Sequence, residues 1–189
     1  FDQHKKNRDS KVPLILWNHR WEFDKNPETF FNTLFKLKNN NINFELAVVG
    51  EQFKEYPKIF DKAKQILKPN IVQFGFCESF TEYAQWLWKA DILPVTSKQD
   101  FFGISIIEAS YCQTYPLLPE RLSYPELFNI NDNPECFYND EDDLYLKLKD
   151  LILNSIDKRD FNLYKYDWNK IYKEYDKRFK VLTAKSIKL

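Results

Sequence analysis

Short apolar runs alternate along this chain with longer segments of helical spacing, and this alternation constrains the fold most strongly. The expected strands are 12–17, 44–49, 71–74, 92–95 and 115–118, and the expected helices are 27–38, 52–68, 80–89, 103–112, 140–152 and 168–179. Strands that alternate with helices in this way form a parallel sheet with helices on both faces. The sequence therefore predicts an α/β, Rossmann-like fold.

The ends of these strands are the natural place for a ligand, because open α/β sheets bind ligands beyond their carboxyl edge. Four segments follow expected strands and should converge on one cleft: Asn18–Lys25, Gly50–Glu51, Gly75–Glu78 and Thr96–Gly103. The chain has no GxGxxG sequence, so the dinucleotide-binding fingerprint is absent. Its 3 glycines are expected only where backbone geometry requires them.

Composition limits the setting in which such a domain would work. The 189 residues suffice for one domain, and the net charge of zero gives no overall field that would attract nucleic acid or an anionic membrane. An odd number of cysteines without a signal peptide favours a reducing compartment, the cytoplasm or the nucleus. No apolar run has the length of a membrane span. Since the chain starts at Phe1 and contains no Met, we expect a longer protein with a preceding N-terminal domain.

The stretch from Ser97 to Ala109 places two carboxylates around a glycine. Asp100 lies in the loop after an expected strand, Gly103 lies where the next helix starts, and Glu108 lies within that helix. Carboxylates accept hydrogen bonds from sugar hydroxyls, and the free amides of a helix N-terminus attract phosphate. The stretch thus suits a sugar joined to a phosphate. An ordinary strand–loop–helix unit with solvated carboxylates is the alternative.

Two cations lie in the loop after the first expected strand. Arg20 and Lys25 are five positions apart, just before the helix that begins near Pro27. Fixed cations stabilise the charge that develops on a departing diphosphate, so the pair is a candidate pyrophosphate site. Two solvated surface cations are the alternative. His19 is expected to be structural, and because no cluster of metal-binding side chains accompanies it, we predict no metal.

Both patterns resemble those of retaining glycosyltransferases with the two-domain GT-B architecture, in the large family-four group. That family has an acidic residue, seven residues and then Glu, with Phe-Gly inside; the first is usually Glu, whereas here it is Asp100, which is one methylene shorter. Its Arg-x4-Lys pattern matches Arg20 and Lys25. The resemblance implies that this cation pair holds the donor pyrophosphate without a metal or other cofactor, and that Asp100 contacts the sugar hydroxyls.

The same resemblance assigns the remaining donor contacts. It implies that the amides of Phe102, Gly103 and Ile104 face the sugar and the phosphate, and that Glu108 accepts hydrogen bonds from the ribose. Phe76, after the third expected strand, would lie near the nucleobase. A buried aromatic beside a turn glycine is the alternative for Phe76.

Longer stretches resemble one group more specifically. Residues 18–27, 97–108, 115–119 and 122–128 are similar to those of the tRNA-queuosine mannosyltransferases. That resemblance covers residues 12–180 and implies the C-terminal half of a GT-B enzyme, with GDP-mannose as donor and queuosine in a tRNA as acceptor. The alternatives are a family-four enzyme that acts on a glycan or lipid, and a non-catalytic nucleotide-binding module.

The expected domain organisation has three parts. Residues 1–11 should be a linker or a disordered terminus, residues 12–165 the donor-binding domain, and residues 166–189 a C-terminal helix. One face of that helix is aromatic and either packs on its own domain or, as in the resembled enzymes, crosses to the N-terminal domain. A fragment of this kind is expected to bind donor but to be inactive as a transferase by itself.

Overall fold

A computed structural model describes residues 1–154, 156 and 160–186 of the chain. Within them, six strands form one sheet in the order β3-β2-β1-β4-β5-β6, and every pairing between neighbours is parallel. The strands are β1 (Leu14–Trp17), β2 (Glu45–Val49), β3 (Ile71–Gly75), β4 (Ile92–Pro94), β5 (Tyr115–Pro119) and β6 (Phe137–Tyr138). The strand order reverses between β1 and β4, so the switch point of the sheet lies between these two strands.

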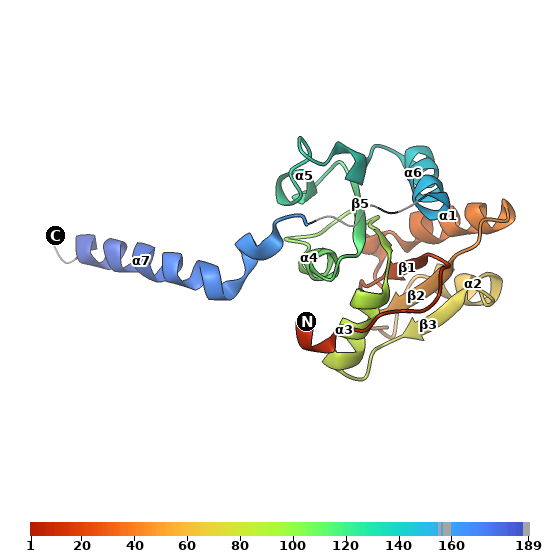
Figure 1. The fold of residues 1–189 in the computed structure, drawn as a ribbon, viewed down its shortest axis with the longest axis horizontal. Helices are drawn as coiled ribbons and strands as arrows, with labels where there is room; N and C mark the ends of the chain where they lie inside the picture. The colour runs from red at the N-terminus through yellow and green to blue at the C-terminus, as the bar shows by residue number, and fades with distance from the viewer. Residues whose placement is uncertain (155, 157–159, 187–189) are drawn as a thin grey trace. The chain divides into compact units, whose positions relative to one another are not determined.

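Helices cover both faces of this sheet, as predicted (Figure 1). The α-helices of this part are α1 (Pro27–Asn39), α2 (Ile59–Ile66), α3 (Phe80–Lys89), α4 (Ile104–Tyr111), α5 (Tyr124–Leu127) and α6 (Glu141–Leu153). Helix α1 packs against α2 and α6 on one side of the sheet, while α3 and α4 contact each other on the other side. Short 3-10 helices add η1 (Asp2–His4), η2 (Phe23–Lys25) and η3 (Pro134–Cys136).

Aromatic side chains fill the core between β1 and the helices α1 and α2. Trp17 is fully buried, and its ring contacts those of Phe30, Phe31 and Phe60 at centroid distances of 4.9 to 6.0 Å. Trp21, just after β1, stacks on Phe60 at 4.2 Å. Because these rings interlock beneath the loop that follows β1, they fix where that loop leaves the sheet.

The expected elements agree with the structure to within two residues at each end, with four exceptions, one of which is that the last helix, α7 (Trp168–Ser186), runs to Ser186 rather than ending at residue 179. Helix α2 begins at Ile59 rather than at residue 52, because Pro57 lacks an N–H group and disfavours a helical conformation in the residue before it. The four-residue helix α5 and the two-residue strand β6 were not predicted. Both are too short to produce a recognisable hydrophobic period.

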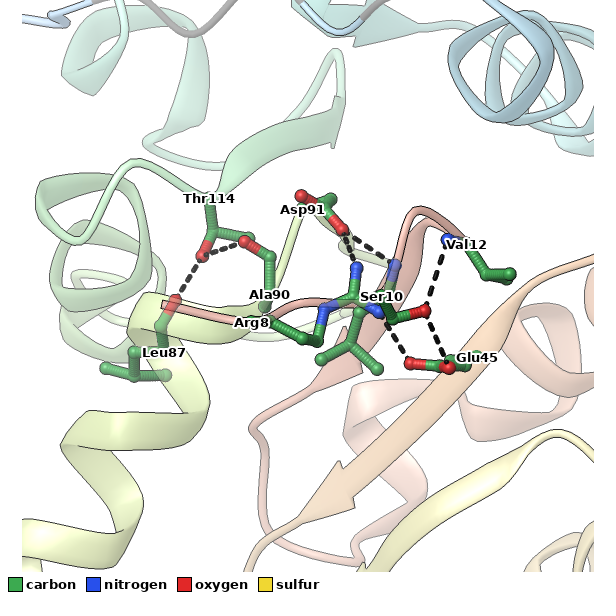
Figure 2. Close-up of polar contacts among 9 residues, drawn as sticks. Arg8, Ser10, Val12, Glu45, Leu87, Ala90, Asp91 and Thr114 are labelled. Carbon is green, nitrogen blue, oxygen red and sulfur yellow. Dashed lines mark hydrogen bonds and ion pairs between the residues drawn. The ribbon is translucent and has the colours of Figure 1, made fainter. Parts of the chain in front are cut away.

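The N-terminal segment, which was expected to be a linker or disordered, makes specific contacts in the structure. Figure 2 shows Arg8 between two carboxylates, those of Glu45 at the start of β2 and Asp91 just before β4. Ser10 donates to the other Glu45 oxygen at 3.0 Å, and Asp91 also accepts from the Leu14 amide at 2.9 Å. Residues 1–11 therefore tie together the amino ends of β1, β2 and β4.

The chain divides into two compact units, Phe1–Arg159 and Asp160–Leu189. The second unit contains the 3-10 helix η4 (Leu163–Tyr166) and the helix α7 (Trp168–Ser186), which contact each other. Along α7, the ring of Tyr175 contacts those of Trp168 and Phe179 at 6.2 and 6.5 Å, as expected for one aromatic face. In the described part of the chain, no helix is both long and apolar enough to cross a membrane.

Candidate functional site

The loops that follow β1 and β4 are joined at the switch point of the sheet. The Lys98 amide donates to the Asp24 carbonyl at 2.7 Å, and the buried Thr96 hydroxyl donates to the carbonyls of Lys25 and Asn26 at 2.9 and 3.0 Å. The loop after β1 is also tied to the loop after β2, because the Trp21 amide donates to the Glu51 carbonyl at 2.9 Å. The structure thus brings together three of the four segments that were expected to converge.

The two candidate cations sit in different surroundings. Arg20 has 57% of its side chain exposed, pairs with Glu22 at 3.1 Å and lies 6.0 Å from the ring of Phe53. Only 12% of the Lys25 side chain is exposed; its ammonium group pairs with Asp24 at 3.1 Å and donates to the Gln99 carbonyl at 2.8 Å. Lys25 is therefore held against the β4 loop, while Arg20 is accessible to an anion.

Asp100 is fixed by hydrogen bonds to both of its carboxylate oxygens. Oδ1 accepts from the Gly103 amide at 3.1 Å, and Oδ2 accepts from the Tyr124 hydroxyl at 3.1 Å. Gly103 has a left-handed backbone with φ +81°, and a Cβ there would lie 3.2 Å from the Tyr124 ring. The Gly103 amide, which the resemblance assigned to the donor, is thus already bound to Asp100, and the short aspartate side chain makes that local bond possible.

The start of α4 next to this loop retains the properties of an anion site. The amides of Ile104 and Ser105 occupy the first turn of α4, where a helix supplies no acceptor of its own. The side chains of Phe102 and Ile104 are 43% and 65% exposed, and Phe101 is fully exposed. These exposed apolar residues adjoin the helix start in the sequence.

Glu108 lies on α4 and is half-buried. Its Oε2 accepts a hydrogen bond of 3.0 Å from the hydroxyl of Tyr83 on α3. Burial raises the pKa of the Glu108 carboxyl, and the hydrogen bond from Tyr83 opposes this rise. The carboxylate keeps further lone pairs that could accept bonds from hydroxyls of a ligand.

His19, at the end of β1, is buried and neutral. Burial lowers the pKa of its imidazole to about 4, with the charge of Asp100 acting in the opposite direction. Its Nδ1 lies 3.3 Å from the Ser105 hydroxyl, and the neighbouring Asn18 donates to the Ser105 carbonyl at 2.7 Å. The two side chains therefore hold the first turn of α4 against the end of β1, which agrees with the structural role expected for His19.

Sequence reasoning missed the contribution of Arg121, which follows β5. Its guanidinium donates to the carbonyls of Ser97 and Thr96 at 3.0 and 2.9 Å, and so supports the β4 loop from the adjacent strand. The hydroxyl of Tyr138 on β6 donates to the Val95 carbonyl at 2.7 Å and supports the same loop. In the sequence, Arg121 lies in the glycine-free segment 119–126, between two stretches that resemble the tRNA-queuosine mannosyltransferases, and nothing in its spacing indicates its partners.

Phe76 lies apart from this centre, after β3, which β2 separates from β1 in the sheet. Its side chain is 63% exposed, so the alternative of a buried aromatic does not hold. Within the described residues, no group of three or more His, Cys, Asp or Glu side chains is arranged to hold a metal ion.

Comparison with known proteins places the chain among the glycosyltransferases. Residues 1–168 match the model of the family "Glycosyl transferases group 1". The chain belongs to this family. A curated relative, the tRNA-queuosine alpha-mannosyltransferase of Drosophila melanogaster, is 36% identical over 140 residues, which are 74% of this chain and 36% of the relative.

Solved structures share the fold at low sequence identity. Sucrose-phosphate synthase from Thermosynechococcus elongatus has a TM-score of 0.73 at 16% identity, covering 92% of this chain and 46% of that protein. The C-terminal domain of a group 1 glycosyltransferase (LpcC) from Francisella tularensis has a TM-score of 0.66 at 18% identity, covering 88% of this chain and 89% of that domain. The glycosyltransferase domain described here thus spans about a third of its curated relative and less than half of the synthase. The predicted GT-B-like α/β fold is confirmed.

Proposed function

We propose that this glycosyltransferase domain binds the nucleotide-sugar donor of a retaining hexosyltransferase. The observation that carries the proposal is the joining of two loops at the switch point, one with Arg20 and Lys25 and the other with Asp100. Helix α4 starts at the same place, and the N–H groups of its first turn have no acceptor within the helix. A diphosphate bound there would interact with the accessible Arg20, with Lys25 and with the N-terminus of α4.

The donor is oriented by groups on the loops after β1, β3 and β4 and on α4. Arg20 and Lys25 bind the pyrophosphate, and the charge they supply stabilises the leaving nucleoside diphosphate. Asp100 and the amides of Phe102 and Ile104 contact the sugar and its phosphate, while the Gly103 amide, which the resemblance also assigned to the donor, holds Asp100 instead. Glu108, further along α4, accepts hydrogen bonds from the ribose, and the exposed ring of Phe76 lies toward the base. In this proposal Arg20 and Lys25 supply the positive charge that the pyrophosphate needs, so donor binding requires no metal.

The whole protein transfers mannose from GDP-mannose to queuosine in tRNA, and works in the cytoplasm or the nucleus. Support for this acceptor comes from the 36% identity to the Drosophila tRNA-queuosine alpha-mannosyltransferase. The domain is neutral overall, so an N-terminal domain supplies most of the phosphate contacts with tRNA. Residues 166–189 then form the connection to that domain and residues 12–165 the donor-binding domain, with residues 1–11 anchored to it through Arg8.

Titration calorimetry of this chain with GDP, UDP and ADP, each with and without EDTA, tests the donor site. We expect GDP to bind most tightly and EDTA to change nothing. Failure of all three nucleotides to bind, or binding that disappears with EDTA, contradicts the donor assignment.

The acceptor is tested with the full-length protein, GDP-mannose and tRNA that either carries or lacks queuosine. A hexose mass should appear on the queuosine nucleoside, and the 189-residue chain by itself should transfer none. Transfer to a glycan or lipid but not to the queuosine-containing tRNA would contradict this acceptor and favour a family-four enzyme that acts on a glycan or lipid. Transfer by the isolated chain would contradict the need for a second domain.

A further inference from the structure

We infer that Tyr124 and Tyr83 are positioning residues, each of which orients one carboxylate of the donor site for a different part of the donor. Tyr124 acts on Asp100 and through it on the sugar; Tyr83 acts on Glu108 and through it on the ribose. The inference rests on the proposed function, because it takes Asp100 and Glu108 as donor ligands. It adds two residues that lie outside both sequence patterns of the site.

Tyr124 reaches the β4 loop from α5, which follows the neighbouring strand β5. Its side chain is fully buried, and its hydroxyl donates to Asp100 Oδ2 at 3.1 Å. The opposite oxygen of Asp100 is held by the Gly103 amide at the same distance, and the Tyr124 ring lies close to Gly103. With one donor on each oxygen, the carboxylate plane has little freedom to rotate.

This arrangement leaves Asp100 able to bind a sugar. Each carboxylate oxygen has two lone-pair sites, so one remains on each oxygen after the bonds to Tyr124 and Gly103 are made. The remaining sites have fixed directions because the Gly103 amide holds one oxygen and the hydroxyl of the buried Tyr124 holds the other. An aspartate reaches less far than the glutamate that is usual at this position, and fixed orientation makes its shorter side chain selective for hydroxyls at one place.

Tyr83 performs the equivalent task from the other side of α4. It lies on α3 and donates to Glu108 Oε2 at 3.0 Å. Burial and the nearby Glu108 charge raise the pKa of the Tyr83 hydroxyl, so it remains a donor at every physiological pH. Because burial raises the pKa of Glu108 and this bond opposes the rise, Tyr83 also favours the ionised carboxylate that accepts two ribose hydroxyls.

The two tyrosines belong to different helices and touch different carboxylates, so their effects should be separable. A purely structural role predicts something else: loss of either hydroxyl would loosen the site as a whole and weaken every ligand alike. The distinguishing measurement is therefore a pair of affinity ratios. One ratio, GDP-mannose to GDP, reports the sugar contacts; the other, GDP to 2′,3′-dideoxy-GDP, reports the ribose contacts.

The experiment compares wild type, Tyr124→Phe and Tyr83→Phe by titration calorimetry with these three ligands. Removing the Tyr124 hydroxyl should lower the GDP-mannose to GDP ratio about 5-fold, as for loss of one hydrogen bond, and leave the ribose ratio unchanged. Removing the Tyr83 hydroxyl should lower the ribose ratio by a similar factor and leave the sugar ratio unchanged. Each variant is the matched control of the other, since both delete one phenolic hydroxyl that donates to a carboxylate of the site.

The outcomes separate this inference from the proposed function. If wild type binds none of the ligands, the donor site itself is wrong and the inference falls with it. If wild type binds but both variants change the two ratios equally, or change neither, only the positioning roles are overturned. Should a tyrosine variant fail to fold, Asp100→Asn and Glu108→Gln test the same two links. Asp100→Asn must lower only the sugar ratio and Glu108→Gln only the ribose ratio; any other result refutes the inference.

Discussion

Of the possible replacements of a glycine by alanine in this domain, Gly50→Ala should destabilise it most. Gly50 directly follows β2 and has φ +149°, and a Cβ there would lie 2.1 Å from the His19 carbonyl oxygen and 2.9 Å from its carbon. Both are backbone atoms, so no flexible side chain can move aside. The strained backbone and the overpacking each cost about 1–3 kcal/mol, which gives roughly 2–6 kcal/mol in total.

Gly75→Ala is the matched control. Gly75 is the last residue of β3 and also has a positive φ, +126°, but a Cβ there meets no heavy atom within 4 Å. It therefore carries the backbone strain without the steric clash. The difference in stability between the two variants therefore measures the cost of the clash alone, about 1–3 kcal/mol. For a domain of this size, Gly50→Ala should melt roughly 2–12 °C below Gly75→Ala.

Thermal unfolding followed by circular dichroism measures this difference, and GDP titration well below the melting temperature measures its consequence for the site. We expect Gly50→Ala to bind GDP more weakly than Gly75→Ala does, because the clash displaces the backbone that carries Arg20. Equal melting temperatures for the two variants would refute the reasoning. They would mean that the loop after β1 shifts freely away from β2.

Further predictions concern charge and pH. Arg20→Ala and Lys25→Ala should each weaken GDP binding by about 1–3 kcal/mol in calorimetry, with or without EDTA; affinity that survives both changes together would contradict the pyrophosphate assignment. Because His19 has a folded-state pKa of about 4 against 6.5 when unfolded, the unfolded state binds more protons below pH 6.5, and stability falls as the pH is lowered through that window. His19 should therefore make the free energy of unfolding, measured with urea, about 2 kcal/mol lower at pH 5 than at pH 7. His19→Gln should remove this difference, and His4→Gln, the control at the other histidine, should retain it. If the difference persists in His19→Gln, the imidazole is not buried. Arg8→Met should lower the free energy of unfolding by about 1–3 kcal/mol, because Glu45 and Asp91, both partly buried, lose the cation that pairs with them. An unchanged urea midpoint would mean that the N-terminal segment is not anchored.

Local periodicity and spacing in the sequence were enough to predict the layers of the fold and two pairs of site residues. Alternating apolar runs and helical faces gave the parallel sheet with helices on both sides, because each element must bury its own apolar face. The pairing of Arg20 with Lys25 and of Asp100 with Glu108 could also be read from spacing, since each pair lies within one strand–loop–helix connection.

The side chains that hold Asp100, Glu108 and the β4 loop in place could not be predicted from the sequence, because they come from distant parts of the chain. Tyr124 and Arg121 lie 24 positions from their partners Asp100 and Ser97 along the chain, and Tyr83 lies 25 from Glu108. These contacts exist because β5 lies beside β4 and α3 lies beside α4. Local periodicity says which face of an element is buried, but not which element will cover it. The order of strands in the sheet, and with it the orientation of each carboxylate in the site, is therefore set by packing between distant segments.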